Sequence, residues 1–122
     1  MWNQPSKKEL SKIPLLYTTE SIPLHQKEIY LHFFIGGCDW YVCEVSEDHE
    51  YLWGFVILSQ DYKNAEWGYI SLSELKSLRI GFTEVDCDLY WKKRPAMEVL
   101  HIRKCHPHWY KYDAKQGAVA RY

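Results

Sequence analysis

The stretch that decides the fold of this chain is EIYLHFFIGGCDWYVCEVSEDHEYLWGFVILS, at residues 28–59. It is rich in aromatic and β-branched residues, which favour β-strands. Gly36-Gly37 and the charged tetrapeptide EDHE interrupt it, and such short breaks are typical of turns between neighbouring strands. We therefore predict three consecutive antiparallel strands, at residues 28–35, 39–46 and 51–59.

Further elements follow this meander along the chain. The sequence EWGYIS at 66–71 predicts a fourth strand after the polar loop QDYKN. Ser71 and Glu74 have the spacing of a capping box, which predicts a short helix after Ser71. TEVDCDLYW at 83–91 alternates in polarity and predicts a fifth strand. Because proline suits the first turn of a helix, Pro95 predicts a second helix of about ten residues in PAMEVLHIRK.

The segment KIPLLYTTESIPL at 12–24 contains two prolines, and each favours an extended conformation in the residue before it. We expect an extended lead-in whose side chains Leu15, Leu16 and Tyr17 pack on the core. With 122 residues, the chain has the size of one domain with one core. The predicted fold class is therefore α+β: a single domain, residues 1–122, with a mainly antiparallel sheet of four to five strands and two short helices.

The composition excludes several classes of protein. No apolar run approaches the roughly 18 residues of a membrane span, and the start MWNQPSKKELSK lacks the apolar stretch of a secretion signal. The four cysteines do not follow the C-x2-C spacing of zinc or redox sites, so we expect reduced thiols that mostly pack as small core residues. These features predict a cytoplasmic protein without a membrane partner.

Charge is distributed unevenly along the chain, although the net charge is only −1. Residues 1–91 carry seven Lys or Arg and fourteen Asp or Glu, whereas residues 92–122 carry eight and two. The basic segment includes HIRKCHPHWYKYD at 101–113, which is dense in histidine and aromatic residues. Because opposite charges attract, the favoured interpretation is a terminal segment that lies on the acidic body and covers apolar surface with its rings.

Two other interpretations of the basic segment stay open. Cations beside aromatic rings can bind phosphates and stack on bases, which makes the segment a candidate for direct binding of single-stranded nucleic acid. The residues for that role are Arg103, Lys104, Trp109, Lys111 and Tyr112. Imidazole and thiol groups are zinc ligands, but their spacing here matches no known signature, so we expect no metal. The candidates for a metal site are His101, Cys105, His106 and His108.

Clustered carboxylates offer a further chemical possibility. One group, Glu84, Asp86 and Asp88, shares a face of the predicted fifth strand, and a second group crowds the turn at 47–50. Carboxylates can hold Mg²⁺ for phosphoryl chemistry. A nuclease would also need a positioned base, and covalent catalysis would need a nucleophile motif that the sequence lacks. A metal-dependent enzyme is therefore the less favoured alternative, and we expect no catalytic residue and no cofactor.

The predicted strands carry more Trp and Tyr than the inner face of one sheet can hold. Aromatic residues make up 16% of the chain. Surplus Trp and Tyr are common anchors of protein interfaces. We predict that a partner protein binds a surface formed by Trp40, Glu66, Trp67, Tyr69 and Trp91.

Four runs of the sequence, IPLLYTTESIPL, CDWYVCEV, GFVILSQDYKNAEWGYISLSELKSLRIG and EVDCDLYW, resemble a family of small bacterial proteins known as domain of unknown function (DUF) family 2958. The resemblance covers about residues 10–95. Members of that family are carried on plasmids, conjugative elements and phages, which implies an accessory role in a mobile genetic element and implies no chemistry. The resulting hypothesis is a non-enzymatic binding protein of a mobile genetic element, directed against a host defence or nucleic-acid-processing protein.

Overall fold

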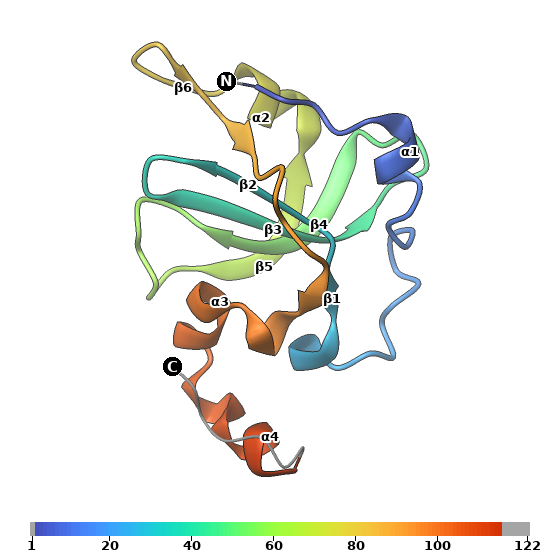
Figure 1. The fold of residues 1–122 in the computed structure, drawn as a ribbon, viewed down its shortest axis with the longest axis vertical. Helices are drawn as coiled ribbons and strands as arrows, with labels where there is room; N and C mark the ends of the chain where they lie inside the picture. The colour runs from blue at the N-terminus through green and yellow to red at the C-terminus, as the bar shows by residue number, and fades with distance from the viewer. Residues whose placement is uncertain (1, 116–122) are drawn as a thin grey trace.

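The central part of the chain forms the predicted antiparallel meander in the computed structural model, which describes residues 2–115 (Figure 1). Its strands pair in chain order as antiparallel neighbours. A further strand joins the free side of the first one and completes a five-stranded sheet in the order β5-β4-β3-β2-β8. The five are β2 (Leu31–Ile35), β3 (Cys38–Val45), β4 (Tyr51–Ile57), β5 (Glu66–Ser71) and β8 (Asp86–Cys87).

The fifth strand is much shorter than the predicted run at 83–91. Val85 and Cys87 are buried as the alternation predicts, but Leu89 is 71% exposed, because the chain leaves the sheet after Cys87. The residues before Val85 instead form a hairpin of β6 (Arg79–Ile80) and β7 (Thr83–Glu84). A second small sheet pairs β1 (Glu28–Ile29) with β9 (Arg94–Pro95), so the first predicted strand is divided between two sheets.

Each face of the five-stranded sheet carries its own apolar core. One face, here called the α2 face, is covered by α1 (Lys7–Leu10) and α2 (Leu72–Ser77) and buries Phe33, Val42 and Leu52. The other, the α3 face, buries Phe55 and Ile57 beneath the C-terminal segment (Figure 1). That segment contains η2 (Ala96–Glu98), α3 (Leu100–Lys104), η3 (Pro107–Trp109) and α4 (Tyr110–Lys115). None of the helices in the described part of the chain is long and apolar enough to span a bilayer.

The helix after Ser71 is confirmed, and its cap differs in one respect from the prediction. The Ser71 side chain accepts a hydrogen bond from the Glu74 backbone N–H. A different carboxylate, Glu50, accepts hydrogen bonds from the hydroxyl groups of Ser71 and Ser73. The reciprocal capping box occurs instead at α1, where Ser6 and Glu9 each bind the other's backbone amide. This first helix was not predicted, because it contains only four residues.

The prediction of one ten-residue helix from Pro95 is wrong. Pro95 lies in β9, and Val99 has an extended conformation (φ −92°, ψ 115°) that separates η2 from α3. Val99 and Ile102 are both buried in the α3-face core. The interruption lets the segment follow the sheet surface and bury apolar side chains that a continuous helix would turn away.

The lead-in at 12–24 also differs from the prediction. Ile13 is buried, whereas Leu15 and Tyr17 are exposed, and most of the segment forms turns. Tyr17 has a positive φ of 72°. The loop is followed by η1 (Leu24–Gln26) and is held by hydrogen bonds between its backbone and Val45. The two prolines therefore lie in a loop of turns beside the end of β3, and not in an extended segment.

A β-bulge in β3 shapes part of the candidate site described below. Val42 pairs with Gly54 and Glu44 pairs with Trp53, so Cys43 is an extra residue in a β-bulge. The bulge places Glu44 beside Trp53 on the α3 face. The two strands lie very close to each other beside the bulge: a β-carbon at Gly54 would lie 1.8 Å from the Tyr41 carbonyl oxygen. Glycine is therefore required at position 54.

Candidate functional site at the β5 edge

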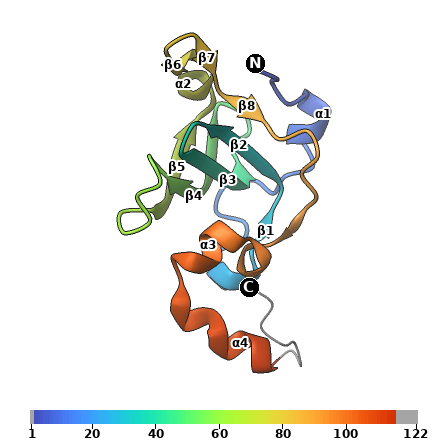
Figure 2. The same cartoon turned by 60° about the vertical axis from the view of Figure 1, so that its left-hand side comes forward.

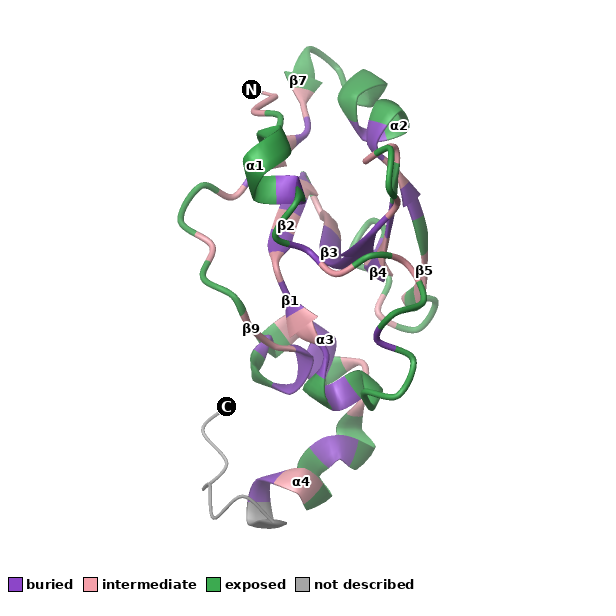
Figure 3. Ribbon diagram, turned by 90° about the vertical axis from the view of Figure 1, so that its right-hand side faces the viewer, coloured by how far each residue is buried: buried purple, intermediate pink, exposed green. Residues whose placement is uncertain are grey.

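Three surface hollows meet at one residue, Tyr69, on the edge strand β5. Their volumes are about 430, 320 and 270 Å³, and Tyr69 lines all of them. The Tyr69 side chain is 57% exposed. β5 forms one margin of the sheet and β8 the opposite margin (Figure 2). Most residues of β5 are exposed or half-buried, in contrast to β3 (Figure 3).

The largest hollow, here called the Lys27 hollow, lies on the α3 face between the loop 16–24 and the strands β4 and β5. Its lining combines apolar and aromatic side chains with a buried ammonium and a buried carboxylate. Lys27 is 6% exposed and Glu44 is 5% exposed. The lining residues are Leu16, Tyr17, Glu20, Ile22, Pro23, Leu24, Lys27, Glu44, Trp53 and Tyr69.

Thr19 connects the two buried charges of this hollow. The Lys27 ammonium donates to the Thr19 carbonyl oxygen at 2.5 Å and to its hydroxyl oxygen at 2.8 Å. The Glu44 carboxylate accepts from the Thr19 hydroxyl group and from its backbone N–H. Burying a charge is costly unless it is paired and hydrogen-bonded, and this network meets that requirement.

Tyr17 forms the wall of the Lys27 hollow opposite the sheet. Its backbone N–H donates to Glu44 Oε1 at 2.9 Å, and its hydroxyl group lies 2.6 Å from that of Tyr69. The hydrogen bond with Tyr17 raises the pKa of Tyr69 above its ordinary value. A non-glycine residue at positive φ is uncommon, and such residues concentrate at functional sites. Tyr17 therefore joins the loop to β3 through its backbone and to the edge strand β5 through its hydroxyl group.

The chemistry of the Lys27 hollow suits recognition of another molecule. An ammonium group has three N–H donors, and Thr19 accepts from Lys27 through two oxygens. The Lys27 nitrogen also lies 5.5 Å from the centre of the Trp53 ring. A ligand with an apolar body and a hydrogen-bond acceptor would thus find aromatic walls and a fixed cation.

The other two hollows lie on the α2 face of the same strand. Neighbouring residues of a strand point to opposite faces, so Ile70 and Tyr69 face opposite sides. The hollow of 320 Å³, here the Glu66 hollow, is lined by Val56, Leu58, Asp61, Asn64, Glu66, Gly68 and Tyr69. The hollow of 270 Å³, here the Glu74 hollow, is lined by Trp40, Val56, Leu58, Tyr69, Ile70, Ser71, Glu74, Leu75 and Leu78.

A separate hollow of about 380 Å³ contains histidine and aspartate side chains. The two ring nitrogens of His32 lie 2.7 Å from Asp39 Oδ1 and 3.4 Å from Asp88 Oδ2. His101 Nδ1 lies 3.1 Å from the Tyr41 hydroxyl oxygen, and burial raises the pKa of Tyr41. Because His101 belongs to α3 and the other four residues belong to the sheet or follow it, the cluster helps to dock α3 on the sheet.

The four candidate metal ligands do not converge on one point in the structure. His101 lies in the cluster just described, and the Cys105 thiol group donates to the His101 carbonyl oxygen. The His106 ring stacks on Trp109 with ring centres 4.0 Å apart, and the His108 ring meets Trp109 edge-on. Across residues 2–115 no three His, Cys, Asp or Glu side chains are grouped so that they could hold a metal ion.

Three of the five candidate nucleic-acid residues are engaged inside the protein. Arg103 is buried and paired with the buried Asp113. Trp109 is buried, and Tyr112 stacks on His25 with ring centres 3.5 Å apart. Lys104 and Lys111 are exposed. The part of the basic segment within 92–115 therefore packs on its own domain; residues 116–122, which include Arg121, lie outside the described residues.

The predicted partner-binding residues lie in different environments. Glu66 and Tyr69 are exposed on β5. Trp67 is half-buried and donates from Nε1 to His106 Nε2, and Trp91 donates to the Ile29 carbonyl oxygen and stacks beneath Arg94. Trp40 is buried in the core of the α2 face, with 6% of its surface exposed where it meets the Glu74 hollow. The structure therefore removes Trp40 as a surface anchor.

Sequence reasoning missed the floor of the Lys27 hollow. Lys27, Thr19 and Glu44 come from separate parts of the chain and meet only after folding. One signal was present, because Glu44 interrupts the otherwise apolar run WYVCEV of a predicted strand. A charged residue in such a run indicates either an exposed position or a buried partner.

Comparisons of the chain with family models, with curated proteins and with solved structures gave no match. The resemblance to domain of unknown function family 2958 therefore stays a prediction from the sequence.

Proposed function

We propose that this chain is a non-enzymatic binding protein that recognises a partner polypeptide through the surface around Tyr69. The observation that carries the proposal is the convergence of three hollows, on both faces of the sheet, at one exposed residue of the edge strand. Exposed tyrosines beside apolar hollows are typical anchors of protein interfaces. The buried network of Lys27, Thr19 and Glu44 keeps the wall of the largest hollow in place before a partner arrives.

The sequence resemblance supports a narrower proposal for the partner. Proteins of mobile genetic elements often act on the host systems that attack foreign DNA. We accordingly propose a cytoplasmic anti-defence role, with a host defence or nucleic-acid-processing protein as the partner. The acidic character of residues 1–91 agrees with a target that itself has a basic surface.

Photo-crosslinking in cells of the natural host tests this proposal. A photoreactive phenylalanine derivative replaces Glu66 or Tyr69 in the tagged chain, and adducts are isolated after irradiation and identified by mass spectrometry. We expect the crosslinked partner to be digested by protease and to survive treatment with nuclease. Matched controls carry the same derivative at Phe82 or Tyr90, which are fully or almost fully exposed but lie away from β5.

Two results would overturn the proposed function. One is the absence of position-specific adducts, with the same proteins captured from positions 66, 69, 82 and 90. The other is an adduct at position 66 or 69 that nuclease removes, which would instead support the alternative of nucleic-acid binding. Circular dichroism of each purified variant shows whether the fold is retained. A variant that does not fold is thereby distinguished from one that has lost binding.

A further inference from the structure

We propose that the partner binds as an extended, basic polypeptide segment that adds to β5 as a sixth strand of the sheet. This inference rests on the proposed function and specifies how the partner is recognised. Addition of a strand to a sheet edge is a common mode of peptide recognition, in which backbone hydrogen bonds supply affinity and side-chain hollows supply specificity.

The first argument is that β5 lacks the features that usually protect an edge strand. Natural edges are commonly short, bulged, or marked by proline or lysine. β5 has six residues in continuous register with β4, and its sequence EWGYIS contains neither proline nor lysine. β8, at the opposite margin, has only two residues. Among residues 2–115, no strand pairs with the outer side of β5.

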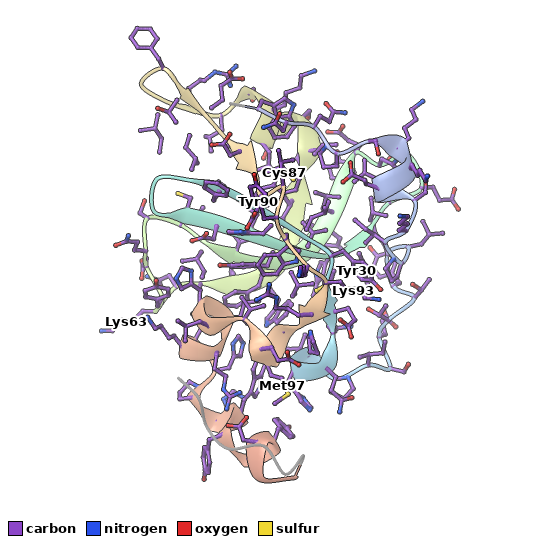
Figure 4. All side chains as sticks on the ribbon, viewed as in Figure 1. Tyr30, Lys63, Cys87, Tyr90, Lys93 and Met97 are labelled. Carbon is purple, nitrogen blue, oxygen red and sulfur yellow. The ribbon has the colours of Figure 1, made fainter. Side chains whose placement is uncertain are left out.

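Gly68 leaves the middle of this edge unobstructed. A β-carbon built at Gly68 would have no heavy atom within 4 Å. The nearest lysine in the preceding loop, Lys63, points away from the body of the molecule (Figure 4). Gly68 therefore has no side chain for an added strand to accommodate, and the space on its side-chain face is open.

The second argument is that the hollows lie on alternate faces, as the side chains of an added strand would. Successive residues of a strand point to opposite sides. The Lys27 hollow lies on the α3 face, and the Glu66 and Glu74 hollows lie on the α2 face. In three consecutive residues of the bound segment, the middle side chain would enter the Lys27 hollow. The side chains before and after it would enter the other two hollows.

The third argument is charge complementarity. Five carboxylates and one ammonium group, Lys27, line the three hollows; Lys27 and Glu44 are both buried and joined through Thr19, which leaves an excess of four carboxylates in the described lining. The carboxylates are Glu20, Glu44, Asp61, Glu66 and Glu74. A basic segment is favoured by this excess of negative charge, and an acidic one is repelled.

Each hollow then selects a type of side chain. The Glu66 hollow combines Val56 and Leu58 with Asp61 and Glu66, so it suits Lys or Arg, whose stem is apolar and whose tip is charged. The Lys27 hollow suits a large apolar or aromatic side chain against Trp53. The Glu74 hollow, which contains Ile70, Leu75 and Leu78, suits an aliphatic side chain or a second long basic one.

Selection from a library of displayed random peptides of about nine residues, long enough to pair along all six residues of β5, tests this inference. The selection uses the full chain, with the Tyr69→Ala variant as a counter-selection. We expect sequences in which a large apolar residue has Lys or Arg as an immediate neighbour, before it in a segment parallel to β5 and after it in an antiparallel one. The selected peptide is then synthesised with an N-methyl group at each residue in turn. Because only alternate N–H groups of an added strand face the edge, we expect losses of roughly tenfold or more at every second residue and small effects between them.

A charge-reversal variant provides the matched control. Glu66→Lys changes an exposed side chain in the Glu66 hollow and leaves the backbone of β5 in place. It should weaken binding of the basic peptide by roughly tenfold and shift a new selection towards acidic residues.

The outcomes separate this inference from the proposed function. If peptides bind in a Tyr69-dependent manner but N-methylation has no period of two, strand addition is overturned and protein binding stands. Selection of no peptide, or of acidic peptides only, also overturns the inference. Failure of the crosslinking experiment described above would reject the proposed function itself.

Discussion

The hydroxyl groups of Tyr17 and Tyr69 lie 2.6 Å apart, although 52 positions separate the two residues in the chain. This contact joins the loop 16–24 to the edge strand β5 and closes the wall of the Lys27 hollow. The backbone of Tyr17 is held separately by Glu44, which the β-bulge turns towards the loop. The shape of the candidate site therefore depends on contacts between the lead-in loop, the bulged strand and the edge strand.

Replacing Glu44 should destabilise the protein more than replacing a carboxylate on the surface would. Glu44→Ala removes the acceptor for the Tyr17 and Thr19 amides and leaves Lys27 buried without its counter-charge. We expect a loss of about 3 kcal/mol in the free energy of unfolding, measured by urea denaturation, and a smaller loss for Glu44→Gln. The exposed Glu47, in the turn after β3, is the matched control. Equal effects of Glu44→Ala and Glu47→Ala would show that the network does not stabilise the fold.

Substitution by alanine should have a large effect at Gly54 in β4 and a small effect at Gly68 in the neighbouring strand β5. Gly54→Ala places a β-carbon 1.8 Å from the Tyr41 carbonyl oxygen, so the strands must separate at the bulge. We expect a loss of about 3 kcal/mol or more, or failure to fold. Gly68→Ala meets no atom within 4 Å and should change stability by less than about 1 kcal/mol. Similar denaturation midpoints for the two variants would contradict the close approach at Gly54.

The buried pair of Arg103 and Asp113 should anchor α4 to α3. Arg103 also donates to the Met97 carbonyl oxygen at 3.1 Å, so it joins three parts of the C-terminal segment. Asp113→Asn leaves a buried guanidinium group without its carboxylate, and we expect a loss of about 3 kcal/mol. Urea denaturation measures the loss. Tyr110→Ala, on the exposed side of α4, should change stability by less than about 0.5 kcal/mol. If Asp113→Asn behaves like Tyr110→Ala, α4 is not held by this pair.

Acidification should loosen the same segment through His106. The ring accepts from Trp67 Nε1 at Nε2, and its Nδ1 lies 2.8 Å from the Ile102 carbonyl oxygen, an arrangement that only the neutral ring satisfies. Burial lowers the pKa of His106 below 6.5. Between its folded and unfolded pKa values the unfolded chain binds more protons. The free energy of unfolding should therefore fall as the pH drops below 6.5 and level off below the folded pKa.

Thermal unfolding between pH 7.5 and 5 measures this dependence, and His106→Gln identifies its source. Glutamine cannot gain a charge in this range, so the variant should show a flatter dependence of the unfolding midpoint on pH. Parallel curves for the variant and the wild-type chain would assign the acid sensitivity to other groups.

Burial should also control the reactivity of the cysteine thiol groups. Desolvation raises the pKa of both Cys43 and Cys87 to about 12. Because the thiolate is the reactive form, both should resist iodoacetamide at pH 8 in the folded protein and react after denaturation. Mass spectrometry of the alkylated peptides measures this, with the half-buried Cys38 as the internal comparison. Rapid labelling of Cys43 in the native chain would show that the bulge opens in solution.

The amino-acid sequence by itself determined the elements whose signals are local. Alternating aromatic and β-branched residues, together with short turns, were sufficient to predict β2 to β5 and their order. Ser71 was sufficient to predict the start of α2. The basic segment does pack on the sheet as far as it is described, but through apolar residues such as Ile102 and Trp109, and the buried Arg103 pairs with Asp113 of the same segment.

Only the tertiary structure decided which residues form the candidate site. The bulge at Cys43 has no turn residue to mark it, and it arises because two strands of unequal residue count pair across it. Thr19, Lys27 and Glu44 meet because that bulge and the folded lead-in loop bring them together. Val99 interrupts the helix predicted at 95–104 because burial against the sheet outweighs local helix preference. Contacts between distant segments depend on strand register and on which surface is left to cover, and neither can be read from a local pattern of residues.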